Sequence, residues 1–213
     1  MTEIICFDMD NTLVRSNNLH VYAFKKAFSK FKLPKKTTKE IIKTFSLEST
    51  VLVRDLYPNL TKKEIIKVVE EHDRIVIREA KNHITVIRGA KGTLKKLKKH
   101  YKIAILSNCK HKEIKAIMKA AKFDKNMFDL IIGNDDVKRP KPFPDEIFKA
   151  KKLLHIKKGY MVGDSIYDIR AGNKAKLKTI GVLTGNHSRT QLRKEKPWKI
   201  LKSVADLPKI LSV

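Results

Sequence analysis

The stretch Cys6-Phe7-Asp8-Met9-Asp10-Asn11-Thr12-Leu13 follows the run Thr2-Glu3-Ile4-Ile5, whose apolar character is typical of a buried strand. The strand ends at two carboxylates, Asp8 and Asp10, and side-chain alternation along a strand places both on one side. Two acids this close repel each other, so one is driven towards protonation unless a cation lies between them. Carboxylate oxygens are hard ligands that suit magnesium. The stretch therefore predicts a magnesium site at the carboxyl end of the first strand.

The size of the chain bounds the fold. Its 213 residues are enough for one domain with a sizeable core, or for one domain that carries an insertion. No apolar run approaches the roughly 20 residues that a membrane span needs, and no signal segment precedes the first strand. The two cysteines, Cys6 and Cys109, imply no disulfide framework. We therefore expect a cytoplasmic protein with no membrane partner.

The net charge is unusually positive, because 48 Lys and Arg residues face 22 Asp and Glu residues, which gives +26. Such an excess is typical of proteins that bind nucleic acid. However, residues 15–84 carry +8 and the rest of the chain +18 over about twice the length, so the density is even. An even spread favours solvated helix faces, and nucleic acid is kept as the minor alternative. A positive field would also attract phosphorylated substrates.

The segment after the first strand is expected to be helical for about 70 residues. The predicted helices run from about Leu19 to before Pro34, from Thr37 or Thr38 to Phe45, and from the capping-box pattern Thr61-Lys62-Lys63-Glu64 to about Lys81. A less regular segment is expected up to Tyr57-Pro58. So long a segment exceeds an ordinary crossover between strands and fits a small inserted domain.

From Gly89 onward, short apolar strands alternate with helices. The expected strands are Lys102–Leu106, Leu130–Ile132, Gly159–Val162 and Lys178–Val182, with a short strand at Ile200–Leu201 and a terminal helix after it. The expected helices are Lys91–His100, Lys112–Ala121, Asp145–Leu154 and Ile166–Ala175. This alternation predicts an α/β fold with a parallel sheet and helices on both faces. We expect the core to comprise residues 1–14 and 85–213, and the all-helical insertion residues 15–84.

Polar residues follow four of the expected strands, at the edge where an open α/β sheet binds its ligand. They are Asp8 and Asp10, Ser107 and Asn108, Lys141, and Asp164 with Asp168 one helical turn later. Each motif alone has a plain structural explanation: Asp164 could be a helix N-cap, and Ser107-Asn108 could be a turn. Their joint occurrence at successive strand ends favours a common site over those explanations.

The residue types indicate phosphoryl chemistry. Asp8 is the candidate nucleophile that forms an aspartyl-phosphate, and Asp10 is the candidate general acid and base. Ser107 and the Asn108 amide can donate to phosphate oxygens, and Lys141, stiffened by three neighbouring prolines, can supply a fixed positive charge. Asp164 is the natural further metal ligand, and Asp168 could orient Lys141 or a metal-bound water.

The motifs Asp8-Met9-Asp10-Asn11-Thr12, Ser107-Asn108, Lys141-Pro142 and Gly163-Asp164 to Asp168 together resemble those of the haloacid dehalogenase superfamily of phosphohydrolases. The resemblance covers essentially the whole chain. It implies a Rossmann-like core, a magnesium ion held by Asp8, the Asp10 main-chain carbonyl and Asp164, and a supporting role for Thr12 and Asp168. The helical insertion resembles the cap of the phosphoglycolate phosphatase and β-phosphoglucomutase branch, in which the cap closes over the site and selects the substrate.

Three cap-region residues leave their roles open. Arg15 stands where an acidic residue is common in the branch, and it could contact a substrate anion or lie at the surface. His20 matches a histidine at the cap hinge of both the mutase and many phosphatases, so it does not discriminate between them. Arg54 could contact the substrate, although a surface arginine is the more frequent case.

We therefore expect a magnesium-dependent phosphatase of a small phosphorylated metabolite, as a monomer or a homodimer. Asp10 favours phosphoryl transfer over dehalogenation, which needs neither the second acid nor a metal. The first alternative is a phosphomutase of the same family. The second is a basic protein that binds nucleic acid, with or without end-phosphatase activity.

Overall fold

The computed structural model describes residues 3–211, and its sheet is built around the first strand. Six parallel strands lie in the order β5-β4-β1-β6-β7-β8. They are β1 (Glu3–Phe7), β4 (Tyr101–Ser107), β5 (Leu130–Gly133), β6 (Gly159–Gly163), β7 (Lys178–Val182) and β8 (Lys199–Leu201). Strand β1 pairs with β4 on one side and β6 on the other, so its carboxyl end lies at the middle of the sheet edge.

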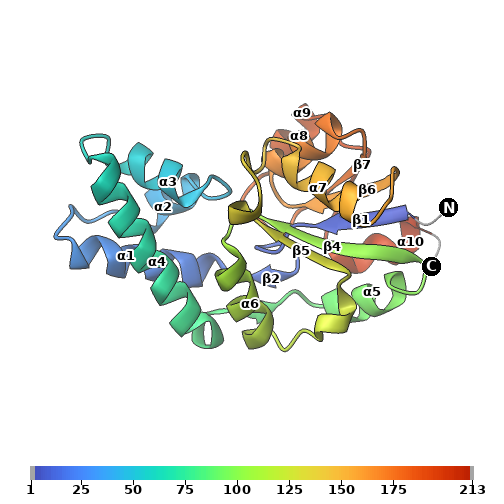
Figure 1. The fold of residues 1–213 in the computed structure, drawn as a ribbon, viewed down its shortest axis with the longest axis horizontal. Coiled ribbons are helices and arrows are strands. Elements are labelled where there is room, and N and C mark those ends of the chain that lie inside the picture. Colours follow the sequence, from blue (N-terminus) through green and yellow to red (C-terminus); the bar gives the residue numbers. More distant parts are fainter. Residues whose placement is uncertain (1–2, 212–213) are drawn as a thin grey trace.

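Helices cover both faces of the sheet because β1 is apolar on both faces. Ile5 and Phe7 pack with residues of α5, α6 and α10, whereas Ile4 and Cys6 pack with residues of α7 and α8. Figure 1 shows the two layers, with α7, α8 and α9 on one side and α5 and α10 on the other. The helices are α5 (Ala90–Leu97), α6 (His111–Ala120), α7 (Asp145–Leu153), α8 (Ile166–Lys174), α9 (Arg189–Lys194) and α10 (Leu207–Ile210), with 3-10 turns at Lys125–Met127, Asn134–Asp136 and Val204–Asp206. The predicted α/β class is confirmed.

Four helices between β1 and α5 form a separate lobe, at the left of Figure 1. They are α1 (Asn17–Lys30), α2 (Thr38–Lys43), α3 (Ser49–Leu56) and α4 (Lys62–His83). The lobe has its own apolar cluster, to which Phe24, Phe28 and Leu52 contribute. We refer to α1–α4 as the cap helices. The expected boundary of the inserted domain at residues 15–84 stays a prediction.

The capping boxes at α2 and α4 confirm the starts expected for these helices. The Thr61 hydroxyl accepts the Glu64 amide, and the Glu64 carboxylate accepts the Thr61 amide at 2.8 Å; Thr37 and Glu40 make the same pair in α2. These side chains satisfy amide groups that the first turn of a helix leaves without a partner.

Four elements differ from the sequence-based expectation. Residues 49–56 form α3 where an irregular segment was expected, and α9 was not expected at all. The two-residue strands β2 (Val14–Arg15) and β3 (Thr85–Val86) pair antiparallel at the junction of the cap helices with the core, so this region is not purely helical. Among residues 3–211, no helix combines the length and the apolar character that crossing a bilayer requires.

Candidate active site

Asp8 is the first residue after β1, and its amide continues the strand ladder to the Val162 carbonyl at 2.9 Å. The chain then turns sharply, because the amides of Leu13 and Val14 both donate to the Met9 carbonyl. Asn11 takes a left-handed conformation in this turn, with φ of 55°, which asparagine tolerates better than most residues. The turn brings Asp10 back beside Asp8 at the mouth of the site.

Lys141 lies in the middle of the buried acids. Its ammonium donates to Asp8 Oδ1 at 2.7 Å, to Asp168 Oδ1 at 2.8 Å and to the Leu106 carbonyl at 2.8 Å. Burial alone would lower the pKa of Lys141, but the Asp168 and Asp8 carboxylates raise it well above its usual value. Lys141 is therefore a permanent cation at the nucleophile.

Asp168 is fixed from the other side by the start of α8. Its second oxygen accepts the Ser165 amide at 3.0 Å and the Ser165 hydroxyl at 2.6 Å, in a capping box. Gly163 makes this approach possible, because a Cβ there would lie 2.2 Å from the Asp168 carboxyl carbon. Both oxygens of Asp168 are thus committed to holding Lys141 and the helix start.

The remaining acids are crowded. Burial raises the pKa of Asp8 to about 8 and that of Asp164 well above its usual value, and the neighbouring carboxylates act in the same direction. Within residues 3–211, oxygen Oδ2 of Asp164 is buried and accepts no hydrogen bond, while Oδ1 has only a long contact, 3.5 Å, with the Thr12 hydroxyl. At Gly185 a Cβ would come within 1.6 Å of Asp164 Oδ2, so this glycine leaves the oxygen open.

This arrangement fits a hard divalent cation. Asp8, Asp164 and Asp168 each offer an oxygen within 4.8 Å of the others, and a cation would relieve the repulsion and satisfy the open Asp164 oxygen. Because Asp168 already holds Lys141 and Ser165, Asp8 and Asp164 are the acids free to bind a metal ion.

Ser107 and Asn108 end β4 beside these groups. Ser107 is buried, and its hydroxyl accepts the Cys109 amide at 3.1 Å. The side-chain amide of Asn108 donates to the Ser46 carbonyl at 3.0 Å and to the Lys141 carbonyl at 2.9 Å. In this conformation the Asn108 side chain joins the loop after α2 to the Lys141 loop, instead of pointing at a phosphate.

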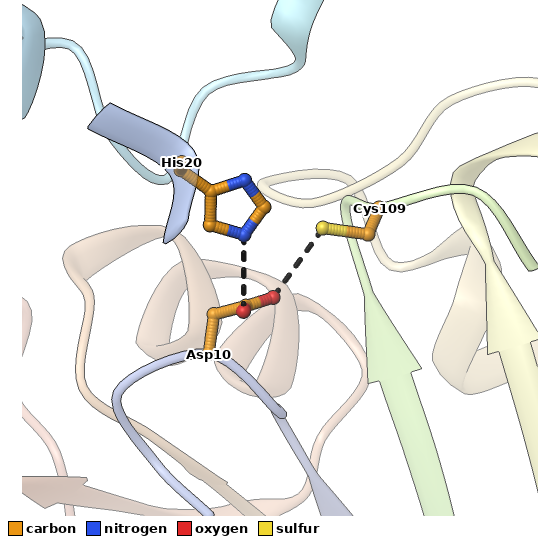
Figure 2. Close-up of side chains that lie close together, drawn as sticks. All are labelled: Asp10, His20 and Cys109. Atoms are coloured by element: carbon orange, nitrogen blue, oxygen red, sulfur yellow. Dashed lines mark hydrogen bonds and ion pairs between the residues drawn. The ribbon is translucent and has the colours of Figure 1, made fainter. Parts of the chain in front are cut away.

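Asp10 makes two side-chain contacts that link it to the cap helices and to the β4 loop (Figure 2). Its Oδ1 lies 3.3 Å from His20 Nε2, at the start of α1, and its Oδ2 accepts the Cys109 thiol at 3.4 Å. Burial would raise the pKa of Asp10, but hydrogen bonding to His20 and the charge of that imidazole lower it to about 2. Burial opposes charge on His20 as well, and the contact with Asp10 outweighs it and raises the His20 pKa.

A buried chain of polar groups continues from His20 into α4. His20 Nδ1 lies 3.2 Å from His72 Nε2, and His72 Nδ1 lies 3.0 Å from Asp73 Oδ1. Lys110 donates to the second Asp73 oxygen at 2.7 Å. Burial lowers the pKa of His72 to about 4, so this imidazole is neutral and accepts from His20 while it donates to Asp73. The sequence-based reasoning missed this chain; its one signal was a histidine on the apolar face of α4.

The cavity over Asp8 is polar on the core side and mixed on the cap side. Its cap-side lining combines the apolar residues Phe24, Phe45, Leu47 and Leu52 with the polar residues Asn17, His20, Ser46 and Ser49. All the core residues predicted for the site except Thr12 line it: Asp8, Asp10, Ser107, Asn108, Lys141, Asp164 and Asp168. Thr12 is buried behind Asp164.

The structure distinguishes the three cap-region residues whose roles the sequence leaves open, Arg15, His20 and Arg54. His20 lines the cavity over Asp8. Arg15 is exposed and lines a different hollow with Asn18 and His83. Arg54 is exposed and pairs with its neighbour Asp55 at 3.2 Å. Of the three, only His20 reaches the candidate site among the described residues.

Comparisons with known proteins identify the family of the chain. A family model described as haloacid dehalogenase-like hydrolase matches residues 5–182. "Pyrophosphatase PpaX" of Bacillus cereus (strain Q1) is 30% identical over 216 residues, which cover 98% of this chain and 95% of that protein. A hydrolase from Pseudomonas syringae is 25% identical with a TM-score of 0.86, covering 100% of this chain and 98% of that one. A predicted phosphoglycolate phosphatase from Haemophilus somnus is 23% identical, with a TM-score of 0.86 over 99% of this chain and 98% of that one. The chain therefore belongs to the haloacid dehalogenase-like hydrolase family and is one of its phosphatases.

Proposed function

We propose that the protein is a magnesium-dependent phosphatase that acts on a small phosphorylated metabolite through an aspartyl-phosphate on Asp8. The observation that carries this proposal is the position of Lys141, whose ammonium bonds both Asp8 and Asp168 beside the open oxygen of Asp164. The Lys141 ammonium and the Asp164 carboxylate, which has an oxygen open to a metal ion, both lie beside the Asp8 carboxylate. Positive charge at this position suits a nucleophile that must attack an anionic phosphoryl group.

The reaction divides into two displacements at phosphorus. A carboxylate oxygen of Asp8 forms a bond to phosphorus while the bond to the leaving oxygen breaks, and that oxygen takes a proton from Asp10. Water then attacks the aspartyl-phosphate, Asp10 accepts a proton from it, and inorganic phosphate leaves. The pKa of Asp10 is lowered to about 2, so Asp10 takes the proton for the first step from His20 Nε2, 3.3 Å from its Oδ1, and returns the proton that it later accepts from water to His20.

Magnesium, held by Asp8, the Asp10 main-chain carbonyl and Asp164, would neutralise charge on the phosphoryl oxygens. Lys141 positions the Asp8 carboxylate, and Asp168 holds Lys141 in place. Ser107 donates to a phosphoryl oxygen once the substrate displaces water from the cavity. Thr12 supports Asp164 through its hydroxyl contact.

The side chains that line the cavity limit the size and the charge of the substrate. Among the described residues, the basic side chains that line the cavity are Lys141 and His20, and the cap side adds apolar and uncharged polar side chains. This lining favours a small substrate with one phosphoryl group and a weakly charged remainder. The relatives named pyrophosphatase, 29–30% identical over 98% of the chain, make inorganic pyrophosphate the second candidate.

The experiment is a panel of small phosphomonoesters and pyrophosphate, assayed for phosphate release with and without magnesium. We expect turnover with magnesium, loss of turnover with a chelator, and loss in Asp8→Asn, whose circular dichroism should match the wild type. Activity that survives in Asp8→Asn would remove Asp8 as the nucleophile, and an undiminished rate with chelator would remove the metal.

The products of the same panel test the first alternative, and a duplex-binding assay tests the second. A mutase would accumulate a sugar-phosphate isomer instead of inorganic phosphate. A nucleic-acid protein would bind duplex with a steep dependence on salt, and salt-independent elution would exclude it.

A further inference from the structure

Three ligand-type atoms from three separate segments meet at the side chain of Asp10 (Figure 2). His20 Nε2 lies 3.3 Å from one Asp10 oxygen, and Cys109 Sγ lies 3.4 Å from the other. The three groups each offer an atom within 4.8 Å of the others. Asp10 follows β1, His20 lies in α1 and Cys109 follows β4, so the cap helices and the core both contribute.

The set of donors differs in kind from the acids that would hold magnesium. Imidazole nitrogen and thiolate sulfur suit zinc and similar ions, whereas magnesium takes oxygen ligands. A tetrahedral zinc with bonds of about 2.0 Å to nitrogen or oxygen and about 2.3 Å to sulfur separates its ligand atoms by about 3.3–3.5 Å. Each contact has about this spacing but involves a different Asp10 oxygen, and the three ligand atoms lie within 4.8 Å of one another, so the side chains shift towards a common point when an ion binds.

The surroundings of His20 are those of a metal ligand. A ligating imidazole normally donates its other N–H to a fixed acceptor, which sets its tautomer and orientation. Here His20 Nδ1 faces His72 Nε2 at 3.2 Å, and His72 is itself held by Asp73 at 3.0 Å. His20 Nε2 is therefore presented towards Asp10 and Cys109 before any ion arrives.

We propose that Asp10, His20 and Cys109 form a second metal site, which binds zinc or a similar thiophilic divalent ion. On binding, the thiol proton of Cys109 and the Nε2 proton of His20 pass to water. All three residues line the cavity over Asp8, so a water molecule can take the fourth coordination position.

The bound ion inhibits the enzyme, and this consequence rests on the proposed function. The ion occupies the Asp10 carboxylate, which can then neither protonate the leaving oxygen nor activate water. Magnesium at Asp8 and Asp164 does not compete for the imidazole or the thiol, so excess magnesium does not relieve the inhibition.

Binding is tested without turnover, by titrating the full-length protein with cobalt(II) in excess magnesium and recording the thiolate-to-cobalt charge-transfer absorption. We expect the band in the wild type and in the control Cys6→Ala, which removes the other cysteine. We expect Cys109→Ser to lose the band and to weaken cobalt binding at least about tenfold. Absence of the band in the wild type, its persistence in Cys109→Ser, or its loss in Cys6→Ala would overturn the proposal.

Two further measurements complete the test, of which the first depends neither on the variants' folding nor on catalysis and the second tests the inhibition. X-ray absorption of the zinc-loaded wild type should show one sulfur neighbour at about 2.3 Å. A shell without sulfur would overturn the proposal and would move the ion to the neighbouring group His20, His72 and Glu113. In the phosphatase assay, Cys109→Ser should need at least about tenfold more zinc for half-inhibition than the wild type and Cys6→Ala.

Discussion

Lys141 is the residue on which the site's electrostatics depend. Its three donors have three buried acceptors, two of them carboxylates, so its removal leaves Asp8 without its cation. We expect Lys141→Ala to lower kcat by about two to three orders of magnitude, as loss of a fixed transition-state charge does. Steady-state kinetics against the best substrate of the panel measure this.

The matched control for that change is Lys149→Ala. Lys149 lies nearby in sequence, is half-buried and pairs with Asp136 at 3.2 Å, and it does not line the cavity. We expect its kcat within about twofold of the wild type, because this ammonium does not reach the reacting groups. Similar rates for the two variants would contradict the role of Lys141.

Glu146 is a buried acid for which the proposed reaction has no role. Burial raises the pKa of Glu146 to about 7 from its usual 4.5, and the Lys141 charge only partly offsets this. Its folded-state pKa lies above the unfolded one, so its favourable contribution is complete below about pH 4.5 and is lost as pH rises to about 7. The wild type should therefore lose stability over this window relative to Glu146→Gln, by on the order of 3 kcal/mol.

The measurement is urea unfolding of both proteins at several pH values between 4.5 and 8. The difference between their free energies of unfolding should change with pH and then level off above about pH 7. A difference that stays constant across this range would show that Glu146 has an ordinary pKa.

From the sequence it could be predicted that the strand-end residues lie together, but not that a chain of buried polar groups continues from His20 to Asp73; the roles of the strand-end residues stay predictions. Asp8, Lys141 and Asp164 each follow a strand in an order that a parallel sheet converts into proximity. His72, by contrast, lies 52 residues from His20 and on another helix, and only the packing of α4 against α1 and α6 brings it there. No spacing rule relates such residues.

At the scale of elements, the start of α4 offers a clean test of local structure. Thr61→Ala removes the hydroxyl that accepts the Glu64 amide and should lower the free energy of unfolding by about 1 kcal/mol. Lys62→Ala, one residue further on, makes no capping bond and serves as the control. Equal denaturation midpoints for the two variants would contradict the capping role.

The elements that the sequence could not predict are short or ambiguous in pattern. Segment 49–56 contains β-branched residues that disfavour helix and buries only Leu52 and Val53, so α3 depends on tertiary contacts with α4. Strands β2 and β3 have two residues each, too few for any periodicity. The five longer strands, by contrast, are apolar runs bounded by polar residues, and all were predicted to within a residue or two.

At the scale of the whole molecule, we expect the net charge of +26 to raise the rate at which the enzyme and its substrate meet. A phosphorylated substrate is attracted over a distance that salt shortens. We expect kcat/KM to fall several-fold between about 0.01 M and about 0.5 M salt, at constant free magnesium, while kcat changes little. A kcat/KM that is independent of salt would show that the charge serves another purpose.

The small ribbon of β2 and β3 has a consequence for how this protein could diversify. Val14 lies opposite Val86 and Arg15 opposite Thr85, so the polypeptide departs and returns at neighbouring points. A segment inserted between two such adjacent points can be lengthened, shortened or replaced by another segment without moving the strands on either side. Enzymes that share this core can thus come to act on new substrates through a different insertion, while the catalytic residues of the core stay the same.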